Sequence, residues 1–190
     1  MRYAALIGFV LMAGAQWYAP LSMILESEAT IDDGVEFKFK TRPVDPTDPF
    51  RGKYITLDFE AENYEPADTN ELKFQDGSLV YVTVGEDSLG FALIRKLTID
   101  PPAGYDFFSA EIQYSYDNRA MLHFPFNRFY LEESKASEAE QVYWSGRSDT
   151  TMVCFAKVKI LNGDAKLVDV VVNDSSIVDV VRRINAGNAD

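Results

Sequence analysis

Two short stretches of the sequence gather the side chains that could do chemistry. The first, "DPTDPFRGKYITLDFE" at residues 45–60, places two Asp-Pro steps and an Arg-Gly pair directly before a strand-like run. The second, "PFNRFYLEESKASEAE" at residues 125–140, mixes arginine and lysine with several glutamates. Carboxylates beside arginine can form bidentate ion pairs, bind a hard cation such as Ca²⁺, or act as a pair in glycoside hydrolysis. The candidate site residues are Asp45, Asp48, Arg51, Gly52, Tyr54, Arg128, Tyr130, Glu133 and Glu140.

The first stretch is also typical of a rigid corner between elements. Proline restricts the residue before it to extended geometry, so Asp45 and Asp48 are both kept out of a helix. Gly52 lets the chain turn tightly before the strand. If the two stretches meet in space, Arg51 or Arg128 can pair with carboxylates of the other stretch and close one end of the fold. We therefore predict a structural polar network, with a ligand or Ca²⁺ site and a carboxylate-pair hydrolase as the alternatives.

The other chemistry-bearing residues form no complete catalytic motif. His123 is the only histidine, and in "RAMLHF" it shares a face with Arg119 and Met121, which favours a surface or rim position. Cys154 lies in the apolar run "TMVCFAKVKIL" and is expected to be a small buried side chain. The sequence has neither a Gly-x-Ser-x-Gly nucleophile elbow nor a phosphate-binding glycine loop. We predict no catalytic residue, metal ion or cofactor, although the sequence leaves open whether the chain is an enzyme.

The composition is that of one acidic globular domain with an added segment. The chain has 190 residues, of which 47% are hydrophobic, and its net charge is −12. This charge excludes nucleic-acid binding, because contacts to phosphate need clustered lysine and arginine. For the same reason the folded part is not expected to bind an anionic lipid surface.

The first 25 residues, "MRYAALIGFVLMAGAQWYAPLSMIL", predict a membrane anchor. Residues 3–25 carry no charge and can span a hydrocarbon core of ~30 Å at ~1.5 Å per residue, and Pro20 is tolerated in membrane helices. A signal peptide with "AGA" at residues 13–15 as its cleavage site, or a buried soluble helix, are the alternatives. Arg2 precedes the segment and acidic residues follow it. This asymmetry predicts a single-pass protein of the inner (cytoplasmic) membrane, with its folded domain on the periplasmic or extracytoplasmic side.

Residues 34–185 are predicted to form one β-domain. Alternation of apolar and polar side chains predicts strands at residues 35–40, 53–60, 78–84, 91–99, 110–116, 119–124, 150–161 and 165–172. Residues 61–77 are polar and predict a long surface loop, whereas the capping-box spacing in "SKASEAEQVYW" predicts a short helix at residues 137–143. The expected fold is mainly β, an antiparallel barrel or sandwich with one short helix, preceded by the transmembrane helix.

Two local features of this domain make specific predictions. Asn162-Gly163 separates two strand runs, which is the strongest sequence signal for a hairpin. In "AEIQYSY" the alternation places Ile112, Tyr114 and Tyr116 on the inward face of a strand.

The stretch "VDPTDPFRGKYITLDF" resembles the defining motif of the GDYXXLXY family, whose positions are taken here by Gly52, Lys53, Tyr54, Leu57 and Phe59. Lys53 stands where the family has Asp, and Phe59 where it has Tyr, which argues against a mechanism that needs that acid or that hydroxyl. The second stretch resembles a downstream family motif, and "AKVKILNGDAKLVDVVVND" resembles the family's terminal hairpin. The matching positions of the downstream motif are Arg128, Tyr130, Glu133, Ala136 and Glu140.

The resemblance implies a bacterial protein with an N-terminal membrane helix, an extracytoplasmic domain and no established activity. Members are often encoded beside polytopic membrane proteins, so a polytopic membrane protein is the implied partner. We expect a binding or accessory module for such a partner. The alternative is a cell-envelope hydrolase, or a ligand- or cation-binding protein, that uses the carboxylate–arginine cluster.

Overall fold

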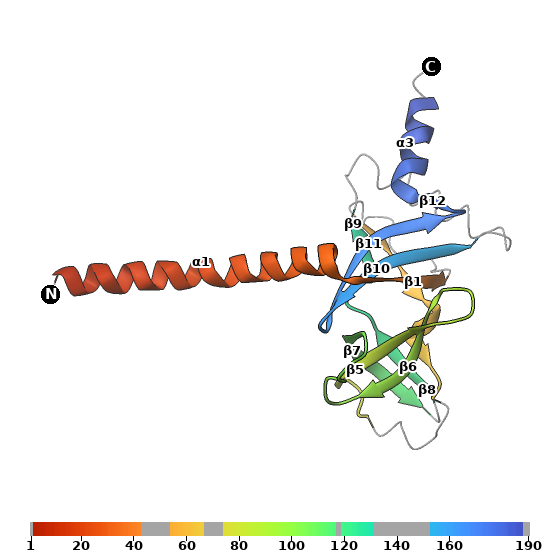
Figure 1. Ribbon diagram of the computed structural model, residues 1–190, viewed down its shortest axis with the longest axis horizontal. Coiled ribbons are helices and arrows are strands. Elements are labelled where there is room, and N and C mark those ends of the chain that lie inside the picture. The colour runs from red at the N-terminus through yellow and green to blue at the C-terminus, as the bar shows by residue number, and fades with distance from the viewer. Residues whose placement is uncertain (1, 43–53, 67–73, 117–118, 131–152, 188–190) are drawn as a thin grey trace.

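The computed structural model describes residues 2–42, 54–66, 74–116, 119–130 and 153–187, which form a β-rich domain on a long helix (Figure 1). The helix α1 (Arg2–Asp33) projects from one side of the domain and continues through Pro20. Its segment Leu6–Asp33 is long and apolar enough to cross a membrane, and none of its apolar window is buried. The expected apolar helix is therefore present, and it continues beyond residue 25 to Asp33.

The first of two larger sheets has its strands in the order β12-β11-β10-β1-β3. Its strands are β1 (Val35–Arg42), β3 (Asp58–Phe59), β10 (Cys154–Leu161), β11 (Asp164–Val172) and β12 (Ser175–Ser176). Between β10 and β11, Asn162 and Gly163 have φ angles of 50° and 96°. Positive φ at both central residues is the requirement of a type I′ turn. The predicted Asn-Gly hairpin is confirmed.

The second sheet has the order β4-β8-β7-β5-β6, and a separate two-stranded ribbon pairs β2 with β9. The sheet consists of β4 (Asn63–Tyr64), β5 (Leu79–Glu86), β6 (Ala92–Thr98), β7 (Phe107–Tyr116) and β8 (Arg119–His123), and the ribbon of β2 (Tyr54–Thr56) and β9 (Arg128–Tyr130). All named strand pairs in the described residues are antiparallel. The predicted mainly β, antiparallel class is confirmed.

Phenylalanine rings fill the core between the two sheets. Five buried rings that contact one another there are Phe39, Phe59, Phe108, Phe124 and Phe126. Phe39 of the first sheet lies 6.1 Å from Phe108 of the second, and Phe108 lies 5.0 Å from Phe124, between ring centroids in both cases. Both pairs are edge-to-face, a geometry that adds about 0.5–1.5 kcal/mol per pair beyond the burial of area. The sheets are thus joined by aromatic packing.

The strand predicted at residues 53–60 changes partners part-way. Tyr54–Thr56 pairs with β9, the Leu57 amide donates to the Asn127 carbonyl at 2.8 Å, and Asp58–Phe59 then pairs with β1. The predicted alternation is correct where side chains are described, because Leu57 and Phe59 are fully buried. The segment therefore joins the ribbon to the first sheet.

The inward position predicted for Tyr114 and Tyr116 is wrong. Ile112 pairs with Leu122 and Tyr114 with Met121, so Gln113 is an extra residue in a β-bulge. One extra residue transfers every later side chain to the opposite face. Tyr114 and Tyr116 consequently lie outside, with exposed fractions of 54% and 75%.

The loop predicted at residues 61–77 contains structure that composition did not indicate. A 3₁₀ helix, η1 (Glu60–Glu62), leads into β4, and both Glu62 and Tyr64 are buried. The expectation of a polar surface loop is wrong for these residues, because η1 leads directly into β4, which pairs with β8 in the second sheet. Residues 67–73 lie outside the described part.

The last described element is a helix that local sequence patterns did not predict. This helix, α3 (Ile177–Gly187), follows β12, and Ile177 at its start is fully buried. The helix that was predicted, at residues 137–143, lies outside the described residues. Cys154 is half-buried against the core, so the prediction of a buried side chain is only partly correct.

The last turn of α1 docks on the β10–β11 hairpin. The Thr30 hydroxyl donates to the Asp164 carboxylate at 3.2 Å, and Lys159 donates to the carbonyls of Ile31 and Asp32. A cation at the last carbonyls of a helix is stabilised by the helix dipole. The helix is therefore attached to the domain by side-chain contacts as well as by the chain itself.

Candidate functional site

The β2–β9 ribbon brings the two sequence motifs together. Tyr54 is paired with Tyr130 and Thr56 with Arg128. The two tyrosine rings lie 5.5 Å apart between centroids, and the Arg128 guanidinium lies 5.2 Å from the Tyr54 ring centroid. A cation over an aromatic face contributes about 0.5–1 kcal/mol at an exposed site. The ribbon thus presents a cluster of two tyrosines and one arginine.

The other predicted site residues cannot be placed against this cluster. Asp45, Asp48, Arg51, Gly52, Glu133 and Glu140 lie outside the described residues. Tyr54, Arg128 and Tyr130 are the predicted site residues that the structure brings into contact. The carboxylate–arginine network remains a prediction.

Glu62 is a buried carboxyl outside the two sequence motifs. Its side chain is 5% exposed, and it accepts hydrogen bonds from the backbone amides of Phe59 at 3.0 Å and Phe124 at 3.5 Å. The Arg42 guanidinium lies 3.8 Å from the same carboxylate. Among the acidic residues of a polar stretch, nothing in its local sequence distinguishes Glu62.

Burial raises the pKa of Glu62 from 4.5 to about 7. The hydrogen bond from Phe59 opposes this shift, and the nearby Asp58 carboxylate adds to it. The hydrogen bond from Phe124 and the charge of Arg42 make smaller opposing contributions. A carboxyl buried in this way is a group whose charge changes near neutral pH.

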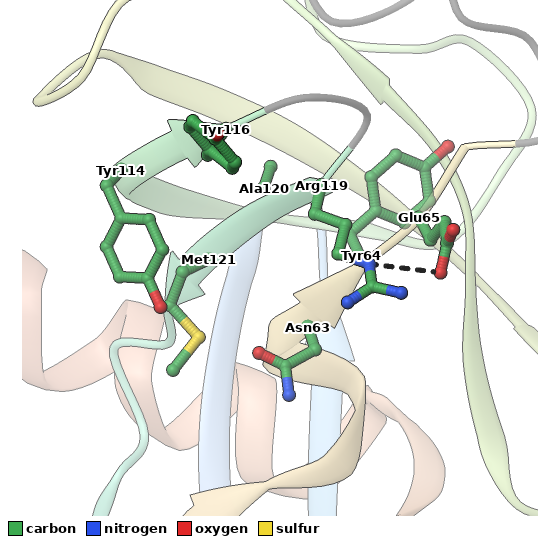
Figure 2. Close-up of a pocket in the computed structure, with 8 residues that line it drawn as sticks. All are labelled: Asn63, Tyr64, Glu65, Tyr114, Tyr116, Arg119, Ala120 and Met121. Carbon is green, nitrogen blue, oxygen red and sulfur yellow. Dashed lines mark ion pairs between the residues drawn. The ribbon is translucent and has the colours of Figure 1, made fainter.

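A surface pocket of about 400 Å³ lies on the outer face of the second sheet (Figure 2). The strand register arranges its side chains in two rows across β7, β8 and β4. One row is Tyr114, Met121 and Asn63, and the other is Tyr116 and Arg119, beside which Glu65 lies just after β4. We call this site the tyrosine pocket. It depends on the bulge at Gln113, which turns both tyrosines outward.

The lining of the tyrosine pocket includes one ion pair. The Arg119 Nε lies 3.4 Å from the Glu65 carboxylate, and both side chains are largely exposed (Figure 2). An exposed pair of this kind contributes little to stability. Its effect on the pocket is to leave the lining with planar polar groups but no net charge.

His123 continues the outer face of β8 beyond the tyrosine pocket. It is half-buried, on the same face as Arg119 and Met121, while Ala120 and Leu122 are buried on the other. Its predicted rim position is confirmed. The described residues contain no cluster of three or more His, Cys, Asp or Glu side chains that could hold a metal ion.

These features define a class of protein, an antiparallel β-domain carried on a long apolar N-terminal helix. The chain belongs to the GDYXXLXY protein family, whose model matches residues 16–170. No curated protein and no solved structure matches the chain. The family match includes the described parts of the ribbon, Glu62 and the tyrosine pocket.

Proposed function

We propose that this protein is a membrane-anchored accessory protein that binds an integral membrane protein on the extracytoplasmic side of the inner membrane. The observation that carries the proposal is α1, an apolar helix that the β-domain leaves exposed. A helix of 32 residues is about 48 Å long, whereas the hydrocarbon core is about 30 Å thick. Its C-terminal turns therefore extend beyond the lipid.

The attachment of α1 supports a role beside another membrane protein. Because α1 is continuous and Thr30 and Lys159 fix its last turn to the hairpin, the domain has a defined orientation relative to the helix. A rigidly mounted domain loses less conformational freedom when it meets a partner embedded in the same bilayer. Confinement to one membrane also raises the effective concentration of the two proteins.

The charge distribution supports the proposed orientation. Arg2 precedes the apolar segment, whereas Glu26, Glu28, Asp32 and Asp33 follow it. Basic residues favour the cytoplasmic side of a membrane helix. The acidic β-domain would also be repelled by anionic lipids, so its exposed surface is available to a protein partner.

Cysteine labelling tests both the anchor and its orientation. In a Cys154→Ala background, Ser88→Cys places a thiol on an exposed turn of the domain, and Tyr3→Cys places one at the N-terminal end of the apolar segment. We expect the full-length chain to remain in the membrane after a carbonate wash. In spheroplasts an impermeant maleimide should label Ser88→Cys at once, and Tyr3→Cys only after permeabilisation. A soluble chain, or the reverse labelling pattern, would contradict the proposal.

Co-purification at native expression tests the partner. We expect a mild detergent extract to yield a polytopic membrane protein together with the full-length chain. A matched chain that keeps residues 1–33 and lacks the β-domain should not recover that protein. If the two chains recover the same proteins, or neither recovers a membrane protein, the accessory role is wrong.

A further inference from the structure

We propose that the tyrosine pocket binds a neutral saccharide, which stacks on the rings of Tyr114 and Tyr116. This inference goes beyond the accessory role and does not depend on the membrane partner. It rests on the position of the rings, the charge of the lining and the pairing of the strands beneath.

The two tyrosines present two separate aromatic rings to the pocket (Figure 2). Tyr114 and Tyr116 are two residues apart on one strand, so their side chains leave the same face of the sheet. Both are more than half exposed. Tyrosine has an apolar ring and a hydroxyl that bonds to polar groups, so exposed rings suit ligands with both characters. A sugar ring has an apolar C–H face and a rim of hydroxyls.

The charge of the lining selects against ionic ligands. Arg119 in the pocket would repel a cation that approached the aromatic faces, and Glu65 at 3.4 Å offsets the attraction of Arg119 for an anion. The net charge of −12 on the chain disfavours an anion further. Among cationic, anionic and neutral ligands, the lining therefore favours a neutral one.

The polar groups of the lining select against a purely apolar ligand. Asn63, Glu65 and Arg119 would lose water to such a ligand without gaining hydrogen bonds, which is costly. Hydroxyl groups can both donate to the carboxylate and accept from the guanidinium and the amide. The pocket volume of about 400 Å³ is at the small end of the range of ligand sites, about 300–1,000 Å³. A ligand of a few rings fits this size.

The sheet beneath the pocket disfavours an extended peptide. Ala120 and Met121 of β8 are paired with β4 on one side, and β7 pairs with β8 on the other. A peptide that binds by strand addition needs an open edge with free amides and carbonyls. Since Ala120 and Met121 are paired on both sides, β8 offers only its side chains to a ligand at the pocket.

A titration of the full-length chain in nanodiscs tests the proposal. The probes are two neutral oligosaccharides, chitotetraose and maltotetraose, which separate an N-acetylglucosamine glycan from a glucan. We expect at least one to show saturation-transfer difference signals in NMR and saturable binding in calorimetry. Tyr114→Ala and Tyr116→Ala should each weaken binding by about ten-fold, because each removes one stacking face.

The matched control is Tyr105→Ala, since Tyr105 is 66% exposed and does not line the pocket. It should leave the affinity unchanged, and all three variants should keep the thermal unfolding midpoint of the parent. Absence of binding by both saccharides at millimolar concentration overturns the proposal. An equal loss in Tyr105→Ala also overturns it. Binding of a proline-rich peptide, but of neither saccharide, that needs Tyr114 and Tyr116 would overturn it in favour of a peptide site.

Discussion

At the scale of single residues, Glu62 is a carboxyl that connects separate pieces of the fold. Its two oxygens accept from amides at the end of β3 and after β8, and Arg42 of β1 lies beside it. Removing the side chain would leave buried amides without acceptors, which costs about 1–3 kcal/mol for each. The carboxyl is thus structural, and its raised pKa is the consequence of its burial.

The raised pKa of Glu62 predicts that the domain loses stability as pH rises. The folded carboxyl keeps its proton up to about pH 7, whereas in the unfolded chain it releases the proton near 4.5. The folded state therefore binds more protons in this range, and its free energy of unfolding falls with rising pH by roughly 3 kcal/mol in total. Urea unfolding at pH 5, 6.5 and 8 measures how steeply the free energy of unfolding changes with pH.

Glu62→Gln should remove most of this pH dependence. The amide keeps an oxygen for the Phe59 N–H and has no charge to bury, so the free energy of unfolding of the variant should depend little on pH. Its NH2 group cannot accept from the Phe124 amide, so the variant should be less stable than the parent at pH 5, and this difference should shrink as the pH rises to 8. Glu60→Gln, at an exposed neighbouring position, is the matched control and should keep the parent slope. Asp87, whose pKa is lowered chiefly by a hydrogen bond from the Phe91 amide, acts only below this pH range. A slope that persists in Glu62→Gln would show that another group causes it.

At the scale of elements, patterns within one strand were predictable and relations between strands were not. Burial of Phe37 and Phe39 follows from local alternation, and the Asn-Gly hairpin follows from the need for positive φ. The bulge at Gln113 is set by the pairing of β7 with β8, so the sequence placed Tyr114 on the wrong face. The sequence motifs identified Tyr54, Arg128 and Tyr130, which the structure brings into contact. Glu62 and the tyrosine pocket could not be identified in this way, because both depend on which strands are neighbours in the sheets.

Gly34 lies between α1 and β1, at a point where the backbone is packed too closely for any larger residue. A Cβ at this position would lie 2.3 Å from the Thr30 carbonyl oxygen and 3.2 Å from the Ile160 backbone. Gly34→Ala should therefore displace the end of α1 and cost about 1–3 kcal/mol, as overpacked sites do. Gly14→Ala is the matched control, because nothing lies within 4 Å of the added Cβ. Equal urea midpoints for the two variants would mean that the junction accommodates the methyl group without strain.

At the scale of the whole molecule, α1 and the β-domain act as one unit if the helix fixes the orientation of the domain. Figure 1 shows α1 entering the first sheet directly, and the contacts of Thr30 and Lys159 reinforce that connection. A flexible linker between them would keep both parts and remove only their fixed relation. The proposed accessory role depends on that relation.

Inserting eight Gly-Ser residues between Asp33 and Gly34 tests this dependence. We expect the variant to remain in the membrane and to lose most of the co-purified membrane protein, because the domain would then have to be ordered on binding. The same insert between Ser88 and Leu89, in an exposed turn, is the matched control and should retain the partner. Quantitative mass spectrometry of the detergent extracts measures the amount of membrane protein that each variant recovers. If the junction insert recovers as much partner as the control, the domain binds as a tethered module, and the direct connection of α1 to the sheet serves stability alone.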